Sequence, residues 1–126
     1  MGPATMRQSL AVSFQAAFTG LLCAIRRQRN LRIHCAAAIS AIVLAVWLGF
    51  SPFEMVVILL VIAVVMISEL LNSAIEQTVD LCVGTNISDG ARLAKDISAA
   101  AVLVGALLAA AIGAILYIPA LWHRLI

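Results

Sequence analysis

The residue types best suited to acid–base or metal chemistry follow the most apolar stretch of the chain. Residues 55–67 are uninterruptedly apolar, and five polar residues come soon after them: Glu69, Asn72, Ser73, Glu76 and Asp80. On an ideal helix these five side chains share one face about 100° wide, and the opposite face is mostly apolar. The spacing therefore predicts a polar helix face that can bind or react. The alternative is that the apolar segment ends at Ile67 and a solvated helix follows.

The positions of Glu69 and Glu76 along this helix suggest two different tasks. The helical rise separates them by about 10 Å, too far for both carboxylates to bind one metal ion from one helix. Glu76, nearer the surface, could hold a Mg²⁺ that carries nucleotide phosphates, because this hard cation prefers carboxylate and phosphate oxygens. Glu69, deeper in the apolar segment, could accept a proton from a hydroxyl that never leaves the membrane, as a general base does. Asn72 and Ser73 could orient these acids or the acceptor hydroxyl.

A second polar cluster opens the last apolar stretch. Lys95 and Asp96 lie one loop after the acidic face, so they can meet Glu76 and Asp80 at the same interface. A lysine ammonium is a point charge well suited to phosphate, and Asp80 could orient a cation such as Lys95 or Arg92. A Lys–Asp pair alone usually anchors a membrane helix, but beside an acidic face it favours nucleotide binding.

The composition places these residues in a membrane protein. The chain has 126 residues, 64% hydrophobic and 11% charged, with a mean hydropathy of +1.13. Soluble domains carry about 25% charged residues, and a domain of this size cannot hide so much apolar surface from water. Residues 33–53 and 97–122 carry no formal charge, and residues 55–71 are interrupted only by Ser68 and Glu69. Each window approaches or exceeds the span length of about 20 residues.

We therefore expect an all-α integral membrane protein with a single domain over residues 1–126. The expected elements are a surface helix over residues 5–28 and three helices, over 31–49, 52–81 and 91–118, that contain the spans. Pro119 is expected to end the last helix. Small residues at i, i+4 spacing, at positions 37–49 and 101–113, allow close helix approach, either within one chain or between subunits.

Residues 5–28 have the pattern of an amphipathic helix in the membrane surface. Four polar residues fall within about 40° of one another and leave a broad apolar face: Gln8, Gln15, Thr19 and Arg26. A signal peptide is the alternative, but a basic cluster follows the run and no small-residue cleavage site does. The arginines of this cluster suit anionic headgroups: Arg26, Arg27, Arg29 and Arg32. The positive-inside rule places the N-terminus and residues 76–96 in the cytoplasm.

Two motifs carry a resemblance to a known family. The segment "ELLNSAIEQTVD", followed by "AKDISAAAVLV", closely resembles the prokaryotic diacylglycerol kinase family, which includes the undecaprenol kinases. The resemblance extends from about Phe14 to Pro119. It implies a homotrimer in the bacterial cytoplasmic (inner) membrane that uses MgATP to phosphorylate a lipid alcohol, undecaprenol or diacylglycerol. The implied partners are that lipid, ATP and the membrane, and no nucleic acid.

The resemblance also implies roles for individual residues. Glu69 matches the catalytic base, and Glu76 matches a Mg²⁺ ligand that also binds the nucleotide. Three further positions match nucleotide-binding or active-site polar residues: Asp80, Lys95 and Asp96. Asn72 matches another active-site polar residue.

The chain departs from the family pattern at Gln28. The family commonly has a glutamate there as second metal ligand, and an amide oxygen can coordinate Mg²⁺ but brings no negative charge. A tyrosine common near Ala16 is also missing, which removes one nucleotide contact. Two alternatives to a kinase are therefore kept: an ion or proton pathway with Glu69 as relay, and a non-catalytic membrane protein.

Overall fold

The computed structural model describes residues 9–86 and 88–126, which form four α-helices. They are α1 (Leu10–Arg27), α2 (Arg29–Leu48), α3 (Pro52–Val83) and α4 (Asp89–Leu125). The prediction of an all-helical chain is confirmed for these residues. The expected helix start at residue 5, and with it Gln8, lies outside the described residues.

Three of the helices are long and apolar enough to cross a membrane: α2 with 20 residues, α3 with 32 and α4 with 37. The bilayer core needs about 20 helical residues, so α3 and α4 both have turns to spare. These extra turns carry the polar residues that follow the apolar run of α3 and those that open α4.

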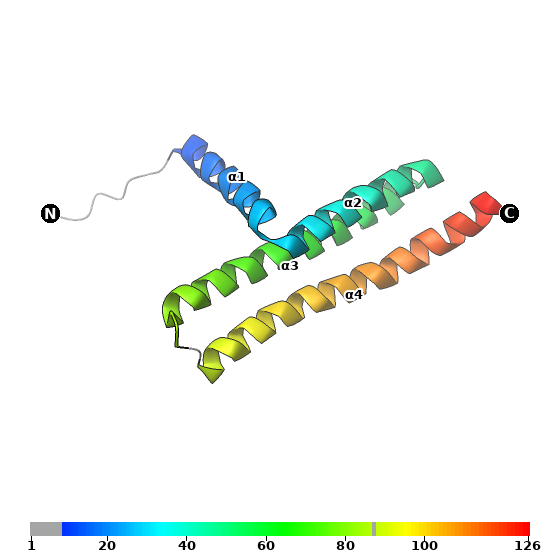
Figure 1. Cartoon of the computed structure of the whole chain (residues 1–126). Helices are drawn as coiled ribbons and strands as arrows, with labels where there is room; N and C mark the ends of the chain where they lie inside the picture. The colour runs from blue at the N-terminus through cyan, green and yellow to red at the C-terminus, as the bar shows by residue number, and fades with distance from the viewer. Residues whose placement is uncertain (1–8, 87) are drawn as a thin grey trace.

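The three long helices form an up–down–up arrangement, with α3 and α4 side by side in opposite directions (Figure 1). Gly105 of α4 is buried at this contact, where a Cβ atom would meet the Ser68 hydroxyl at 3.6 Å. Ala45 of α2 is also fully buried. At these two positions the small residues therefore serve helix packing within one chain.

The helix ends follow from local capping chemistry. Ser51 and Glu54 form a reciprocal capping box at the start of α3, behind a left-handed Gly49 at φ 76° that ends α2. Ser88 caps α4 by accepting the backbone N–H of Ala91. These caps turn the chain sharply and make the long helices antiparallel neighbours.

The helix α4 continues through Pro119 to Leu125, whereas we expected it to end at this proline. A proline removes one backbone donor and crowds the preceding turn, yet the turns on either side keep their bonds and the helix persists. Contacts of Tyr117, two residues earlier, hold this end in place. The Tyr117 hydroxyl donates to the Ala41 carbonyl at 2.7 Å, and its ring lies 4.8 Å from that of Phe50.

The first helix separates from the others at Gln28, whose backbone is extended (φ −98°, ψ 112°). Figure 1 shows α1, on the N-terminal side of this residue, pointing away from the long helices. No residue of α1 is buried in the chain. Its apolar face, which includes Phe14 and Phe18, is therefore available to lipid or to another subunit.

Candidate active site

The polar face of α3 is graded in burial along the helix. Glu69 and Ser73 are 3% and 4% exposed, Asn72 and Glu76 are half-buried, and Asp80 is exposed. Glu69 therefore lies inside the helix bundle, and α3 does not become a solvated helix directly after Ile67. The gradient separates a buried acid from a water-accessible one on a single helix.

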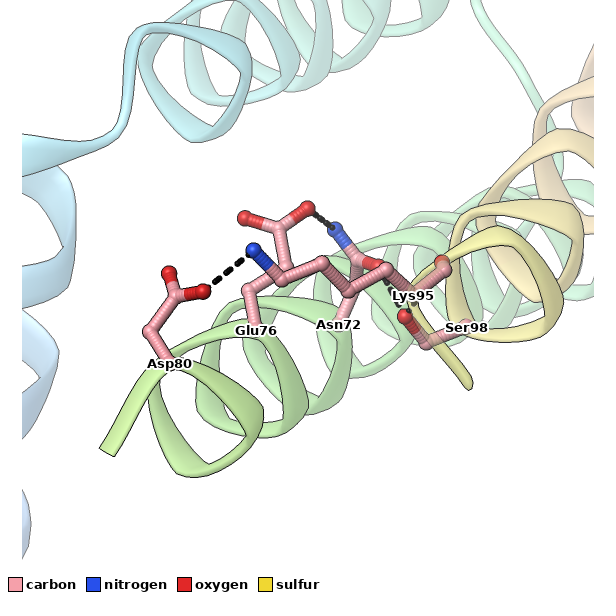
Figure 2. A network of polar contacts seen from close by, with 5 residues as sticks. All are labelled: Asn72, Glu76, Asp80, Lys95 and Ser98. Atoms are coloured by element: carbon pink, nitrogen blue, oxygen red, sulfur yellow. Dashed lines mark hydrogen bonds and ion pairs between the residues drawn. The ribbon is translucent and has the colours of Figure 1, made fainter. Parts of the chain in front are cut away.

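Hydrogen bonds join α3 to α4 across this face (Figure 2). Lys95 Nζ donates to Asp80 Oδ1 at 2.5 Å, so the structure forms the ion pair expected between these residues. The Ser98 hydroxyl lies 2.6 Å from Asn72 Oδ1 and 2.8 Å from the carbonyl of Lys95. Asn72 Nδ2 in turn donates to Glu76 Oε1 at 3.0 Å.

This network determines which way the Asn72 amide points. A serine hydroxyl has one hydrogen to donate, and a carboxylate only accepts. With Oδ1 facing Ser98, the NH₂ group faces Glu76, whereas the flipped amide would place two acceptors together. Asn72 therefore orients one oxygen of Glu76 and leaves the other, Oε2, for a further ligand. Ser98 is 5% exposed, and its spacing of three residues from Lys95 was the only sequence signal for its role.

Glu69 has a partner that the sequence analysis did not identify. His34 Nε2 lies 3.1 Å from Glu69 Oε1, and this pair is fully ionic only while the imidazole is protonated. The available signal was an ionisable residue inside an apolar span. A charge count that takes histidine as neutral finds no charge in residues 33–53 and so does not reveal His34.

Two predicted site residues lie apart from this network. Asp96 is exposed on α4 and has no polar side-chain partner among the described residues. Gln28 is half-buried at the break between α1 and α2, and its side chain caps neither helix.

The donor set around Glu76 fits Mg²⁺ held together with a nucleotide. No group of three or more His, Cys, Asp or Glu residues within 9–86 and 88–126 could enclose a metal ion. Mg²⁺ does not require such a cage, because it usually keeps several waters and takes one or two carboxylates plus phosphate oxygens. Glu76, with Oε2 unused by the network, meets that requirement.

A cavity of about 460 Å³ opens between the end of α3 and the start of α4. Its charged lining residues are Asp80, Arg92 and Lys95. Ligand pockets commonly occupy about 300–1,000 Å³, so this cavity is of a size to admit an anionic group beside Arg92 and Lys95.

Comparison with known proteins identifies the family. Residues 15–117 match the family model described as prokaryotic diacylglycerol kinase. A diacylglycerol kinase of Synechocystis sp. is 41% identical over 113 residues, which are 90% of this chain and 65% of that protein. The chain thus matches just under two thirds of that relative's length.

Two other relatives are covered over more of their length. The undecaprenol kinase of Bacillus subtilis is 37% identical over 109 residues, 86% of this chain and 88% of its own. The diacylglycerol kinase of Escherichia coli K12 is 36% identical over 90 residues, 71% of this chain and 73% of its own. With matched residues extending from α1 into the last turns of α4, the chain belongs to the prokaryotic diacylglycerol kinase family.

Proposed function

We propose that this protein is an ATP-dependent lipid kinase that phosphorylates the hydroxyl of a membrane lipid alcohol at the cytoplasmic interface. The acceptor is undecaprenol or diacylglycerol, the substrates in the names of its relatives. The observation that carries the proposal is the polar face of α3, where the buried Glu69 carboxylate lies about three turns from the Lys95–Asp80 ion pair, with Asn72 and Glu76 between them. Neither a conducting pathway nor a non-catalytic role is favoured by the family.

The burial gradient suits the two substrates. A lipid alcohol keeps its tail in the membrane, so its hydroxyl approaches from the apolar side, where Glu69 lies. ATP approaches from water, where Lys95 and Asp80 are partly exposed. Both substrate sites include a residue of α3, Glu69 for the lipid and Asp80 for ATP. One helix therefore fixes the distance between the two sites, and a fixed geometry of the reacting groups favours transfer.

Each residue has a defined task in the transfer. Glu69 accepts the proton of the hydroxyl as its oxygen bonds to the γ-phosphorus and the bond between that phosphorus and ADP breaks. Lys95 neutralises charge on the phosphates, and Asp80 holds its ammonium in place. Asn72, with Ser73 one position on, orients the acids. We assign Asp96 to the nucleotide and Gln28 to the metal, both from outside the hydrogen-bond network of α3 and α4.

The metal requirement follows from the substrate. Mg²⁺, when bound with ATP, offsets the negative charge that spreads over the phosphoryl oxygens during transfer. Glu76 would hold it through Oε2, with Gln28 as an uncharged second ligand. The neutral Asn72 amide orients the Glu76 carboxylate and leaves its negative charge available to the metal ion.

The proposal extends to the whole assembly. We place the protein in the bacterial inner membrane with its N-terminus and the α3–α4 loop in the cytoplasm, since the N-terminal region carries several arginines and Arg92 and Lys95 lie in the first turns of α4, directly after that loop. In this orientation α1 lies on the cytoplasmic surface. We further propose a homotrimer, in which exposed helix faces meet and neighbouring subunits complete the site.

A substrate panel tests the function. Purified protein in lipid vesicles is given labelled MgATP with undecaprenol, diacylglycerol or a shorter isoprenol, and phosphate incorporation into lipid is measured. Transfer to at least one lipid is expected. Glu69→Gln should reduce kcat by about 10²- to 10⁴-fold, the usual contribution of general acid–base catalysis.

Two controls make this result interpretable. Ser40→Ala should behave like the wild type, because that hydroxyl bonds only to the Ala36 carbonyl of its own helix. No transfer to any of the lipids, or equal rates for Glu69→Gln and the wild type, would falsify the assignment.

A further inference from the structure

We propose that His34 is a positioning residue that holds the Glu69 carboxylate where it receives the proton of the lipid hydroxyl. The inference rests on the proposed kinase function and goes beyond it by assigning a second residue to the base. His34 lies in the second turn of α2, and its Nε2 is 3.1 Å from Oε1 of Glu69 on α3. The contact therefore connects two helices.

The burial of the pair shows why this contact matters. The Glu69 side chain is 4% exposed and that of His34 is 25% exposed. A buried carboxylate requires a polar or charged partner, because its desolvation is otherwise costly. Among residues 9–86 and 88–126, no hydrogen bond to the Glu69 carboxylate accompanies the His34 contact, and no second ion-pair partner lies near it. His34 is thus the side chain that restrains the carboxylate.

Among the described residues, the imidazole of His34 has no acidic partner other than Glu69. It lies at one end of a cavity between α2, α3 and α4 whose lining is otherwise almost entirely aliphatic, with residues such as Ala38, Ile58 and Val65. The other titratable lining residue is Tyr117, whose hydroxyl is committed to the Ala41 carbonyl. No carboxylate is among the residues that line that cavity, so it offers the imidazole no competing acid.

The geometry divides the two oxygens of Glu69 between two tasks. His34 contacts Oε1, which leaves Oε2 for the hydroxyl of the acceptor. A glutamate side chain has three rotatable bonds, so an unrestrained carboxylate would spend much of its time away from the reacting position. A misplacement of about 1 Å can cost about 100-fold in rate. Restraint from α2 removes that freedom without occupying the reactive oxygen.

Kinetics separate this role from a purely structural one. His34→Leu should lower kcat roughly 10- to 100-fold, on the scale of a misplaced base, and leave the KM for MgATP unchanged. His34→Gln, whose amide nitrogen can approach Oε1 in place of Nε2, should restore part of kcat. In a Glu69→Gln background His34→Leu should cause no further loss, because residues that act as a unit are not additive.

Spectroscopy tests the contact without any turnover. The chain has two histidines, His34 and His123 near the C-terminal end of α4, so imidazole ¹⁵N signals are readily assigned. Glu69→Gln should shift the His34 signals and leave those of His123 in place. This comparison uses the wild-type His34 and stays informative if His34→Leu does not fold.

Each result decides one question. A wild type that transfers no phosphate overturns the kinase function, whereas an active wild type with an unaffected His34→Leu overturns only the role of His34. Equal losses from His34→Leu in both backgrounds would show that it acts independently of Glu69. Unshifted His34 signals in Glu69→Gln would show that the contact is not formed.

Discussion

The side chains of this candidate site have different chemical environments because they lie at different depths. Glu69 and Asp80 are both acids on α3, yet the Glu69 side chain is 4% exposed and that of Asp80 62% exposed. Electrostatic interactions are weak in water and stronger where water is excluded. The exposed acid can therefore release or bind ions readily, and the buried one depends on its single neighbour.

Lys95 offers a direct test of the charged rim. Its ammonium is paired with Asp80 and partly exposed, so it can reach a phosphate without leaving its partner. Hydrogen bonds to charged groups contribute about 1.5–3 kcal/mol. Lys95→Met should therefore raise the KM for MgATP about tenfold or more in the phosphate-transfer assay, with the KM for lipid unchanged.

The matched control for Lys95→Met is Arg124→Gln. Arg124 stacks on Trp47 with 5.3 Å between the guanidinium carbon and the ring centre, near the end of α4 opposite to Lys95. Arg124→Gln should leave the KM for MgATP unchanged. Equal effects of the two substitutions would indicate general loss of cationic charge, and an unchanged KM for Lys95→Met would remove it from the nucleotide site.

The site residues of α3 and α4 can contact each other only if the two helices keep a fixed position along each other. The hydrogen bond from Ser98 to Asn72, 2.6 Å long, joins them at the site, and Gly105 allows close approach two turns further along α4. Small residues favour such contacts in membranes, where apolar attraction alone does not bring helices together. The site geometry thus depends on packing well inside the apolar region.

Substitutions at two glycines of the same stripe should separate packing within the chain from packing between subunits. Gly105→Leu should destabilise the protein by about 1–3 kcal/mol, as overpacking does, because the new side chain would meet Ser68 and Val64. Gly105→Ala should be tolerated, since its Cβ has 3.6 Å to the nearest atom. Unfolding in mixed micelles, followed by circular dichroism, measures both.

Gly113 provides the control on the same helix. A Cβ at Gly113 would meet nothing within 4 Å in this chain, so Gly113→Leu should leave the stability of an isolated subunit unchanged. Destabilisation of Gly113→Leu with loss of the oligomer would show that this half of the stripe is a subunit contact. A neutral Gly105→Leu would contradict the α3–α4 packing described above.

The molecule as a whole gathers most of its lysine and arginine residues toward one end, and Arg124 is the one that the described helices carry at the other. The start of α2, the end of α3 and the start of α4 lie toward one end, with Arg29, Asp80 and Lys95 among their residues. The α2–α3 turn at the other end carries no basic residue and is closed by Ser51 and Glu54. Because basic segments stay on the cytoplasmic side, this asymmetry predicts that the candidate site faces the cytoplasm.

Cysteine labelling in cells tests this orientation. The three native cysteines, which are free thiols, are replaced by alanine, and Phe53→Cys or Asn86→Cys is added at an exposed position near either end. A membrane-impermeant maleimide should label Phe53→Cys in intact spheroplasts, and Asn86→Cys only after permeabilisation. The reverse pattern would place the site on the wrong side for ATP.

Much of this molecule follows from local sequence patterns. The apolar lengths predicted three long helices, and the 3.6-residue period placed Glu69, Glu76 and Asp80 on one face, because both properties depend only on neighbours in the chain. The pairing of Lys95 with Asp80 was also predictable, since a short loop joins their helices. Pro119 misled the prediction because the turns around it keep enough bonds to continue the helix.

Long-range packing determined the rest. His34 and Glu69 are 35 positions apart and meet only because α2 folds back on α3, and Ser98 selects the orientation of Asn72 from a third helix. No local pattern contains these distances, since they depend on how far each helix slides and turns against the next. The chemistry of the face is therefore local in origin, and the restraint on each reactive atom comes from helices distant in sequence.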